Sequence, residues 1–383
     1  MKILIYDRID SNKASTHIIH LMEVSNNLSR LGHKVIYSDL NNSNKNITFK
    51  RLTFVESLKY LEFRRFLLSL AIIIRSGKPD IIYSRHGGIF NTGYILAKLI
   101  KVPLIKEVNG LAIDEIKIWK TRNIFILKAL ELIERVNLHN NSRIVAVTDK
   151  LKEILVNEYG IEENKICVIQ NGANTEMFKP MPSSIAKEKL NLDINKKYIC
   201  YVGSLSPHQG LEYFIKCMPY VFESVPNVQV LIVGYGGMEQ EIKDLVEKIG
   251  AKNRFTFTGS VAYEKVPLYI NSSDICIVPK KPWRIGYSPL KLHEYMACGK
   301  PVIATRTDGF SDLEKQNAGL LVDIENKEEF SNAIIRLLKD EKLGNLMGLN
   351  GRNYVIANHS WANVAKKISE LCFDAIDENL RIK

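Results

Sequence analysis

Short apolar runs recur along the first half of the chain, and longer stretches with helical spacing separate them. Such runs are typical of strands that are buried on both faces of a parallel sheet. The runs are Ile3–Tyr6, Val35–Ser38, Asp80–Ser84, Pro103–Glu107 and Arg143–Val147. The helical stretches are Thr16–Leu31, Ser57–Ser76 and Ile124–Leu138. This strand–helix–strand rhythm predicts a doubly wound α/β domain.

A second series of the same kind begins after residue 195. Its apolar runs are Tyr198–Val202, Val228–Val233, Arg254–Thr258, Ile275–Val278 and Pro301–Ala304. The stretch Asn174–Asn195 contains Pro180 and Pro182, and we predict that it crosses between two domains. The chain ends in a helical pattern around Trp361–Ile376. A length of 383 residues suits two domains better than one core.

Composition narrows the class of protein. The chain is 46% hydrophobic and 25% charged, as globular proteins are. Its six cysteines form no CxxC pair and lie mostly in apolar runs, which indicates buried thiols rather than a disulfide framework or a zinc site. The start MKILIYDRID is too short and too charged for a signal peptide. The apolar stretch Phe66–Ile74 is too short for a membrane helix, which needs about 20 residues. We therefore expect a cytoplasmic protein.

The net charge of +11 is uneven along the sequence. Residues 1–180 hold 27 Lys and Arg against 18 Asp and Glu, a net charge of +9, whereas the remainder holds 26 against 24. An excess in one half suggests an anionic partner. Ordinary solvated faces explain the excess equally well.

Two glycine-containing loops follow expected strands in the second half. Residues 201–210 contain Gly203, and residues 231–237 contain Gly234 and Gly236. Glycine lets the backbone approach a ligand closely, and the amino terminus of the next helix attracts phosphate. An ordinary turn explains each loop equally well, because a lone GxGG is a weak signal.

Residues 286–303 have the clearest chemical character. Ser288 and Pro289 open a predicted helix, whose first turn favours proline and whose free N–H groups can hold a diphosphate. Lys291 places a positive charge in that turn, where the helix dipole disfavours it unless an anion binds. Glu294 lies one turn further along the same face, and its carboxylate can accept two ribose hydroxyls.

This stretch resembles the signature of family 4 of the retaining GT-B glycosyltransferases. Residues 169–178, Phe257–Ser260 and Ser273–Pro279 stand in the order and at the spacing of further family motifs, so the resemblance covers most of the chain. It implies two Rossmann-like domains that face each other across a cleft. The implied parts are an acceptor-side domain in residues 1–180, a donor domain in residues 190–355, and a C-terminal helix in residues 356–383 that packs back on the first domain.

By position, the resemblance implies a nucleotide-sugar site in the donor domain. Glu294 matches the second glutamate of a paired motif that holds the ribose, and the helix start matches the place that receives the diphosphate. Asn109, Lys291 and Glu294 are the residues expected to act in catalysis. The donor-binding residues that it implies are Gly203, Ser204, Gln209, Gly234, Gly236, Gly259, Val261, Lys280, Arg284, Ser288, Pro289, Leu290, Lys291 and Glu294.

The acceptor side is expected at two strand ends of the first domain, at Arg85, His86, Glu107 and Asn109. Family members often have a histidine near the position of Asn109. Asparagine can hold a sugar hydroxyl but is no general base at neutral pH, and the resemblance implies that the donor phosphate acts as the base. Asn109 also suits a turn before Gly110, and His86 also suits a loop without a ligand role.

The sequence departs from the family pattern in three places. Gly286 stands where the first glutamate of the paired motif is expected. Ser204 and Gln209 stand where two loop cations usually neutralise the leaving diphosphate. Residues 8–15 replace a glycine-rich turn. Our hypothesis is that three basic side chains replace the missing loop charge: Lys280, Lys281 and Arg284. The alternative is that these side chains are only solvated.

We therefore expect a glycosyltransferase that moves a sugar, with retention of configuration, from a nucleotide-sugar to a glycan acceptor. The chain contains no DxD triplet, so we expect no metal and no other cofactor. The main alternative is a GT-B subunit that binds nucleotide-sugar and has lost its chemistry. A sugar-nucleotide epimerase is less favoured, and no module for nucleic-acid binding is visible.

A membrane-borne acceptor is a further expectation. The stretch Ser57–Ser76 has phenylalanine and leucine beside Arg64, Arg65 and Arg75, and residues 46–54 add aromatic and basic side chains. This combination suits the surface of an anionic membrane, so we expect peripheral association and a lipid-linked acceptor. The alternative is that the apolar face packs on the sheet and the arginines point to water.

Overall fold

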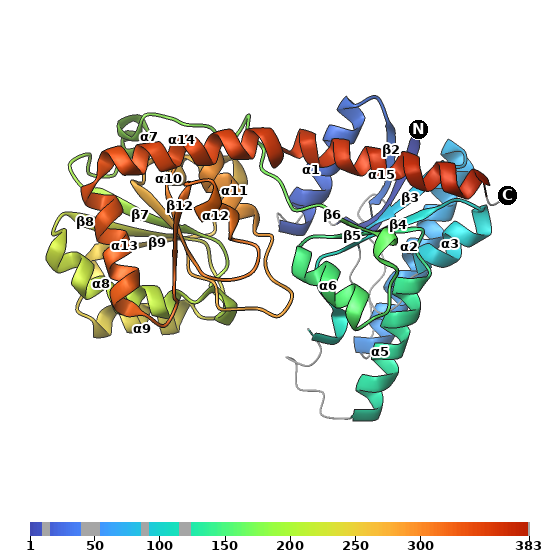
Figure 1. The fold of residues 1–383 in the computed structure, drawn as a ribbon, viewed down its shortest axis with the longest axis horizontal. Coiled ribbons are helices and arrows are strands. Elements are labelled where there is room, and N and C mark those ends of the chain that lie inside the picture. Colours follow the sequence, from blue (N-terminus) through green and yellow to red (C-terminus); the bar gives the residue numbers. More distant parts are fainter. Residues whose placement is uncertain (10–15, 40–53, 86–91, 115–123, 382–383) are drawn as a thin grey trace, which may run out of the picture. The chain divides into compact units, whose positions relative to one another are not determined.

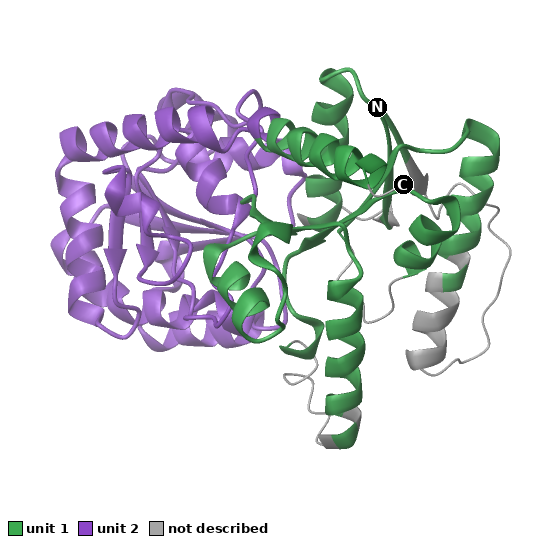
Figure 2. Cartoon of the chain, turned by 45° about the vertical axis from the view of Figure 1, so that its right-hand side comes forward, with its two compact units in different colours: residues 1–170, 364–383 green, residues 171–363 purple. Residues whose placement is uncertain are grey.

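The computed structural model describes the whole chain except residues 10–15, 40–53, 86–91, 115–123 and 382–383. It divides into two compact units (Figure 2). Unit 1 contains residues 1–170 and 364–383, and unit 2 contains residues 171–363. The expected crossing, Asn174–Asn195, thus lies within unit 2, where it includes the short helix α7 (Ser183–Lys189).

Unit 1 is built on a parallel six-stranded sheet in the order β2-β1-β3-β4-β5-β6. The strands are β1 (Lys2–Ile9), β2 (Lys34–Asp39), β3 (Ile81–Ser84), β4 (Leu104–Val108), β5 (Arg143–Ala146) and β6 (Ile166–Val168). The helices between them are α1 (Thr16–Arg30), α2 (Phe54–Ser76), α3 (Thr92–Ile100), α5 (Ile124–His139) and α6 (Asp149–Asn157). Strands β3 and β4 are buried throughout, which explains their unbroken apolar sequences.

Unit 2 repeats the architecture with the strand order β12-β11-β10-β7-β8-β9, again parallel. The strands are β7 (Lys197–Val202), β8 (Val228–Val233), β9 (Phe255–Gly259), β10 (Ile275–Val278), β11 (Val302–Thr305) and β12 (Gly319–Val322). The helices are α7, α8 (Leu211–Ser224), α9 (Glu239–Lys248), α10 (Val266–Asn271), α11 (Leu290–Ala297), α12 (Asp312–Lys315), α13 (Lys327–Lys339) and α14 (Glu341–Asn358). Two apolar cores, one on each face, sandwich this sheet.

The last helix, α15 (Trp361–Arg381), begins at the end of unit 2 and continues as part of unit 1 (Figure 1). Within unit 1, the Ser369 hydroxyl hydrogen-bonds to the His33 ring over 2.7 Å, and the Glu378 carboxylate pairs with Arg143. The prediction of two Rossmann-like sheets, with a C-terminal helix that returns to the first, is therefore confirmed.

Helix α2 corrects one expectation about charge. Arg65 is fully buried, and its guanidinium carbon lies 5.6 Å from the centre of the Tyr6 ring. The hypothesis that this arginine faces either a membrane or water is therefore wrong. Phe66 and Leu70 pack on the core of the sheet, whereas residues 46–53 of the same hypothesis lie outside the described residues.

Candidate functional site

The loops that follow β7, β8 and β9 in unit 2 lie against one another and need their glycines for packing. Gly234 has φ +133°, and a Cβ there would meet the Gly203 carbonyl oxygen at 2.0 Å. At Gly236 it would meet the Leu205 carbonyl oxygen at 2.2 Å. Gly259 accepts a 2.9 Å hydrogen bond from the Gly234 amide. These glycines therefore hold the strand ends together, whether or not a ligand touches them.

Lys291, in the first turn of α11, reaches across to the loop after β7. Its ammonium group lies 4.2 Å from the centre of the Tyr201 ring and donates to the Gln209 side-chain oxygen over 3.0 Å. Gly203 makes room for it, because a Cβ at that position would lie 2.4 Å from the Lys291 nitrogen. Burial lowers the pKa of Lys291 well below its ordinary value, and the charge of Lys280 lowers it further.

Lys280 follows β10 and is the second cation of this cluster. Its ammonium group lies 4.3 Å from the centre of the Tyr287 ring. Burial lowers the pKa of Lys280 to about 8. Among the described residues, neither Lys280 nor Lys291 has a carboxylate within ion-pair distance, so the two charges have aromatic faces rather than anions beside them. Oxyanions are the ligands that such a cation pair attracts.

The other basic residues of the predicted group are placed differently. Lys281 pairs with Glu212 over 2.6 Å, which neutralises much of its charge, and Arg284 is exposed. Lys280 is thus the one member of the three that the structure brings beside Lys291. Ser204 and Gln209, at the positions of the missing loop cations, lie next to each other, with 3.4 Å between the Gln209 amide nitrogen and the Ser204 hydroxyl.

The start of α11 differs by one residue from the prediction. Pro289 is the N-cap, and the helix begins at Leu290. Ser288 precedes it, and its hydroxyl accepts a 2.8 Å hydrogen bond from the Asn171 amide. The Val202 amide donates to the Tyr295 hydroxyl over 2.7 Å, which ties α11 to β7. These bonds hold the start of α11 in place, and the amino terminus of a helix attracts anions.

Glu294, one turn after Lys291, is buried in the same helix. Its Oε1 accepts a 2.8 Å hydrogen bond from the Tyr263 hydroxyl. Tyr263 comes directly after the loop that contains Gly259 and Val261, and its ring packs on Phe178 with 5.4 Å between centres. This contact joins the residues expected at the ribose to the loop expected at the base.

Position 286 explains one departure from the family pattern. Gly286 has φ +68°, a conformation that favours glycine, and a Cβ there would lie 3.0 Å from the Cβ of Asp308. A glutamate at this position would be strained and crowded. The backbone at this position therefore suits glycine and disfavours the glutamate of the family pattern.

Unit 1 contains a second polar cluster, centred on Glu107 at the end of β4. Its Oε1 accepts from Arg85 over 2.8 Å and from Asn109 over 2.7 Å. Its Oε2 accepts from His20 over 3.0 Å and from the Tyr83 hydroxyl. A carboxylate offers about four acceptor positions, so Glu107 has none left for a proton or a substrate. It can act on a ligand only through its neighbours.

Charge and hydrogen bonding keep Glu107 ionised. Burial alone would raise the pKa of Glu107, but His20, Arg85 and the Tyr83 hydrogen bond hold it well below its ordinary value. Burial and the neighbouring Glu107 raise the pKa of Tyr83 far above its ordinary value, so its hydroxyl remains a donor. The buried carboxylate is therefore permanently negative.

Arg85 connects this carboxylate to three further side chains. It donates to the Asn109 oxygen over 3.1 Å and to Nδ1 of His17. A guanidinium only donates, so Nδ1 of His17 carries no proton, and its Nε2 must donate to Asp7 over 3.1 Å. Arg85 and Asn109 are thus held rigidly at the strand ends. His86, the remaining acceptor-side candidate, lies outside the described residues.

Comparison with known proteins now decides the family. The model named glycosyl transferases group 1 matches residues 183–354, and the model named glycosyltransferase family 4 matches residues 19–177. The chain belongs to glycosyltransferase family 4. Family members use nucleotide-sugar donors, so this is a glycosyltransferase, as the sequence predicted.

One sequence relative and two solved structures show what this chain is similar to. An Escherichia coli UDP-Gal:α-D-GlcNAc-diphosphoundecaprenol α-1,3-galactosyltransferase is 26% identical over 337 residues, which are 85% of this chain and 83% of the relative. Sucrose-phosphate synthase from Thermosynechococcus elongatus has the same fold, with a TM-score of 0.78, 21% identity, and coverage of 98% and 99% of the two chains. Anabaena HepE in complex with UDP gives a TM-score of 0.75, 18% identity, and coverage of 98% and 100%.

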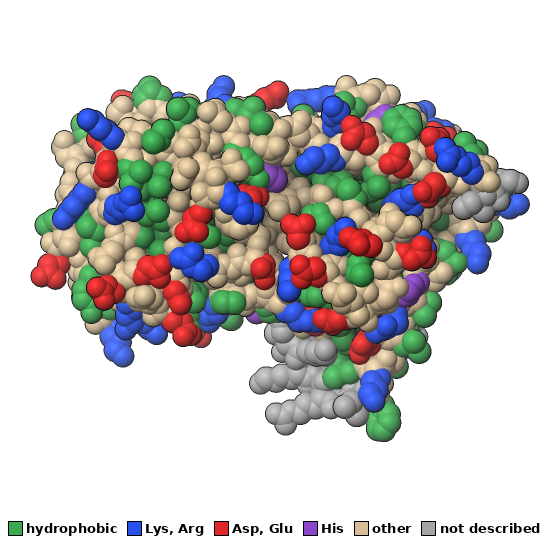
Figure 3. Space-filling view, viewed as in Figure 1, with side chains coloured by type: hydrophobic (Ala, Val, Ile, Leu, Met, Phe, Trp, Pro, Cys, Tyr) green, Lys and Arg blue, Asp and Glu red, His purple; other side chains and the backbone are tan. Residues whose placement is uncertain are grey.

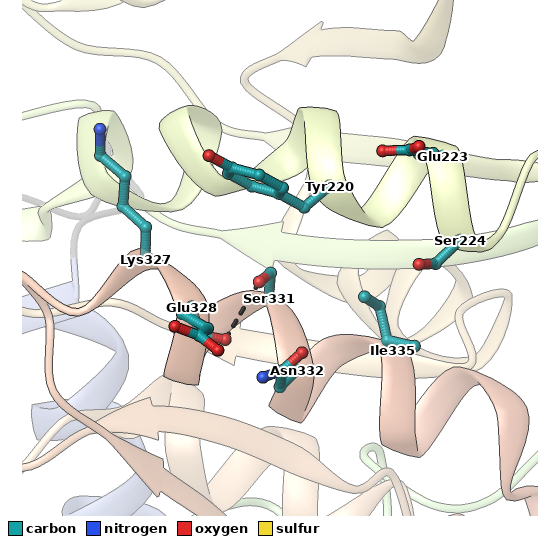
Figure 4. A pocket seen from close by; sticks show the side chains of 8 residues that line it. All are labelled: Tyr220, Glu223, Ser224, Lys327, Glu328, Ser331, Asn332 and Ile335. Atoms are coloured by element: carbon teal, nitrogen blue, oxygen red, sulfur yellow. Dashed lines mark hydrogen bonds between the residues drawn. The ribbon is translucent and has the colours of Figure 1, made fainter.

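The glycosyltransferase has other features that carry no chemistry. A groove of about 440 Å³ lies between α8 and α13, with Tyr220, Lys327 and Ile335 in its lining (Figure 4). Its walls come from two outer helices rather than from strand ends, so it is not the candidate site. Across the described ranges, no group of three His, Cys, Asp or Glu side chains is arranged to hold a metal ion.

Sequence reasoning found the cations and the carboxylate of α11, but it missed the side chains that hold them. Tyr201, Tyr263 and Tyr287 support Lys291, Glu294 and Lys280, respectively. Tyr201 stands at the start of the glycine-containing segment 201–210, but nothing in that segment indicates a ring beneath a lysine. His20 and Tyr83 of the unit 1 cluster gave no signal, because their contact with Glu107 is made by the fold.

Proposed function

We propose that this chain transfers a sugar from a nucleoside diphosphate sugar to a glycan acceptor, with retention of anomeric configuration. Unit 2 binds the donor. Lys280, Lys291 and the first turn of α11 receive the diphosphate, and Glu294 receives the ribose. The two lysines carry this proposal, because no carboxylate of the described residues lies within ion-pair distance of either and a diphosphate would supply two negative charges beside them.

The unit 1 cluster argues against one of the two retaining routes, a double displacement. A double displacement needs a carboxylate that can attack the anomeric carbon. Glu107 has its acceptor positions filled, and Asn109 is no nucleophile. In our proposal the acceptor oxygen forms its bond to the anomeric carbon on the face from which the diphosphate leaves, and the acceptor hydroxyl gives its proton to that phosphate. Arg85 and Asn109 hold sugar hydroxyls in this scheme.

The ribose role of Glu294 gives a direct test. Glu294→Ala should weaken nucleoside diphosphate binding by about 1–3 kcal/mol, since buried ribose hydroxyls lose their acceptor. The measurement is calorimetry with UDP and GDP. Glu264→Ala, one residue after Tyr263 and exposed, is the control and should bind as the wild type does. Unchanged affinity in Glu294→Ala would show that the donor site is misassigned.

The pKa of Lys280 predicts a pH dependence for nucleotide binding. The charged form of Lys280 attracts the diphosphate, and it is lost as pH rises through about 8. The last phosphate ionisation of the nucleotide has a pKa of about 6, so it is complete before Lys280 begins to lose its proton. Nucleoside diphosphate affinity should therefore fall several-fold between pH 7.5 and 9.5. Because one proton is lost, the fall is limited to about tenfold per pH unit. In Lys280→Met the affinity should be lower and its fall above pH 8 smaller. An identical profile in both proteins would contradict the assignment.

A lipid-linked acceptor is the finer part of the proposal. The Escherichia coli relative acts on a diphosphoundecaprenol-linked sugar. On α2, Phe63, Leu67 and Ile74 fall on one stripe of the helix and are 60%, 47% and 76% exposed. No described helix is long and apolar enough to cross a bilayer. We propose that this stripe rests on an anionic membrane surface.

Vesicle flotation tests that surface. The wild type should float with vesicles that contain anionic lipid at low salt and should be released as salt rises, because each nearby cation contributes about 1 kcal/mol. Acidic and basic side chains are interspersed on the face drawn in Figure 3, so that face offers no uniformly basic patch to a membrane. The triple variant with serine at these positions (Phe63→Ser, Leu67→Ser and Ile74→Ser) should stay in the bottom fraction of the gradient. Leu346→Ser with Leu349→Ser, equally exposed on α14, is the matched control. Equal flotation of both variants would favour an acceptor free in solution.

The subunit alternative has one observation in its favour, the glycine at position 286, whose left-handed backbone disfavours a glutamate. Donor turnover separates the two functions. A transferase should release nucleoside diphosphate from its nucleotide-sugar, slowly with water and faster with acceptor. A subunit should bind the nucleotide-sugar and release nothing.

A further inference from the structure

A hydrogen bond from Tyr263 joins the segment after β9 to Glu294. The Tyr263 hydroxyl and the Glu294 Oε1 atom are 2.8 Å apart, and 31 residues separate them along the chain. The Tyr263 ring is partly buried and packs on Phe178, which is fully buried. A phenol held in this way has little freedom to leave the carboxylate.

The carboxylate needs such a support. Glu294 has three side-chain torsions, and in a helix several of its rotamers point along the surface rather than toward a ligand. The Tyr263 hydroxyl occupies one acceptor position of Oε1, and a carboxylate has about four such positions. The bond therefore fixes the orientation of the carboxylate before a nucleotide arrives, so that less of the ordering cost remains for binding.

We propose that Tyr263 is a positioning residue that gives the donor site its preference for ribose over deoxyribose, by fixing the carboxylate of Glu294. This inference rests on the proposed donor site. Tyr263 does not touch the diphosphate in this scheme, since Lys280 and Lys291 are supported by other tyrosines. Its effect should appear in the sugar of the nucleoside and not in its phosphates.

The test compares UDP with 2′-deoxy-UDP and GDP with 2′-deoxy-GDP by calorimetry, on the full chain. The wild type should prefer the ribonucleotide of the better-bound pair by about tenfold or more, as sites that accept hydrogen bonds from hydroxyls do. Tyr263→Phe should reduce that preference to about threefold or less. Its affinity for inorganic diphosphate should equal that of the wild type. Tyr269→Phe is the control, since that tyrosine packs in the same core and its hydroxyl has no hydrogen-bond partner among the described residues.

The outcomes separate this inference from the donor-site proposal. If Glu294→Gln abolishes the ribose preference and Tyr263→Phe keeps the wild-type value, the positioning role is wrong and the site stands. If Glu294→Gln also keeps the preference, or if the wild type binds none of the four nucleotides, both are wrong. A loss of diphosphate affinity in Tyr263→Phe would indicate a general structural role and would overturn the inference.

Discussion

Replacing Lys291 with glutamine is expected to lower the turnover number by about 100- to 1000-fold, as the loss of one preorganised group that stabilises developing charge typically does. The bond from sugar to phosphate breaks with negative charge on the diphosphate. Lys291 is the cation at the start of α11, and it is held by the Tyr201 ring and by Gln209. The nucleotide-sugar KM should change much less, because the charge grows in the transition state.

A second substitution makes this prediction specific. Gln209 lies 3.0 Å from the Lys291 ammonium, so a lysine at 209 can return a charge to the same place. Gln209→Lys in the Lys291→Gln background should recover turnover by about tenfold or more. Lys281→Gln is the matched control, because the Glu212 pair already neutralises that lysine, and it should keep near-normal turnover. Equal losses in Lys281→Gln and Lys291→Gln would mean that only the general positive charge matters.

The apolar runs located most strands within about two residues, because a strand buried on both faces has an unbroken apolar sequence. Two strands escaped. Strands β6 and β12 have only three and four residues, so their apolar runs are too short to stand out in the sequence. The predicted start of α11 was one residue off, because Pro289 has an extended ψ of 127° and lies just before the first helical residue.

The candidate site was predictable where its residues share one helix. Lys291 and Glu294 are three positions apart, and helical spacing alone puts them on one face. The contacts that orient them join distant parts of the chain, as Tyr263 with Glu294 does across 31 residues and His20 with Glu107 does across 87. A single sequence carries no record of such pairs. The burial of Arg65 was missed for the same reason, because its partner ring, Tyr6, comes from another element.

Glu107→Ala is expected to destabilise unit 1 by about 3–5 kcal/mol, as the removal of one member of a buried ion pair does. The substitution leaves the charge of Arg85 without its carboxylate, and it leaves the donors of His20, Tyr83 and Asn109 without an acceptor. Hydrogen exchange of β3 and β4 reports on unit 1 alone, and these strands should exchange faster by the corresponding factor. Glu153→Ala, whose carboxylate makes an exposed pair with Lys150, should leave exchange unchanged.

The pH dependence of that stability distinguishes charge from packing. The pKa of Glu107 is lower in the folded chain than in the unfolded chain. The stabilisation by Glu107 is therefore complete above its pKa in the unfolded chain, about 4.3. It is lost as pH falls toward the pKa in the folded chain. Glu107→Gln keeps the shape and one acceptor oxygen but cannot ionise, so it should be less stable than the wild type at pH 7 and should lose less stability on acidification. Glu107→Gln could instead match the stability of the wild type at pH 7 while Glu107→Ala unfolds. That result would mean that the cluster stabilises unit 1 through packing, and that Arg85 does not need this carboxylate to hold its place at the strand ends.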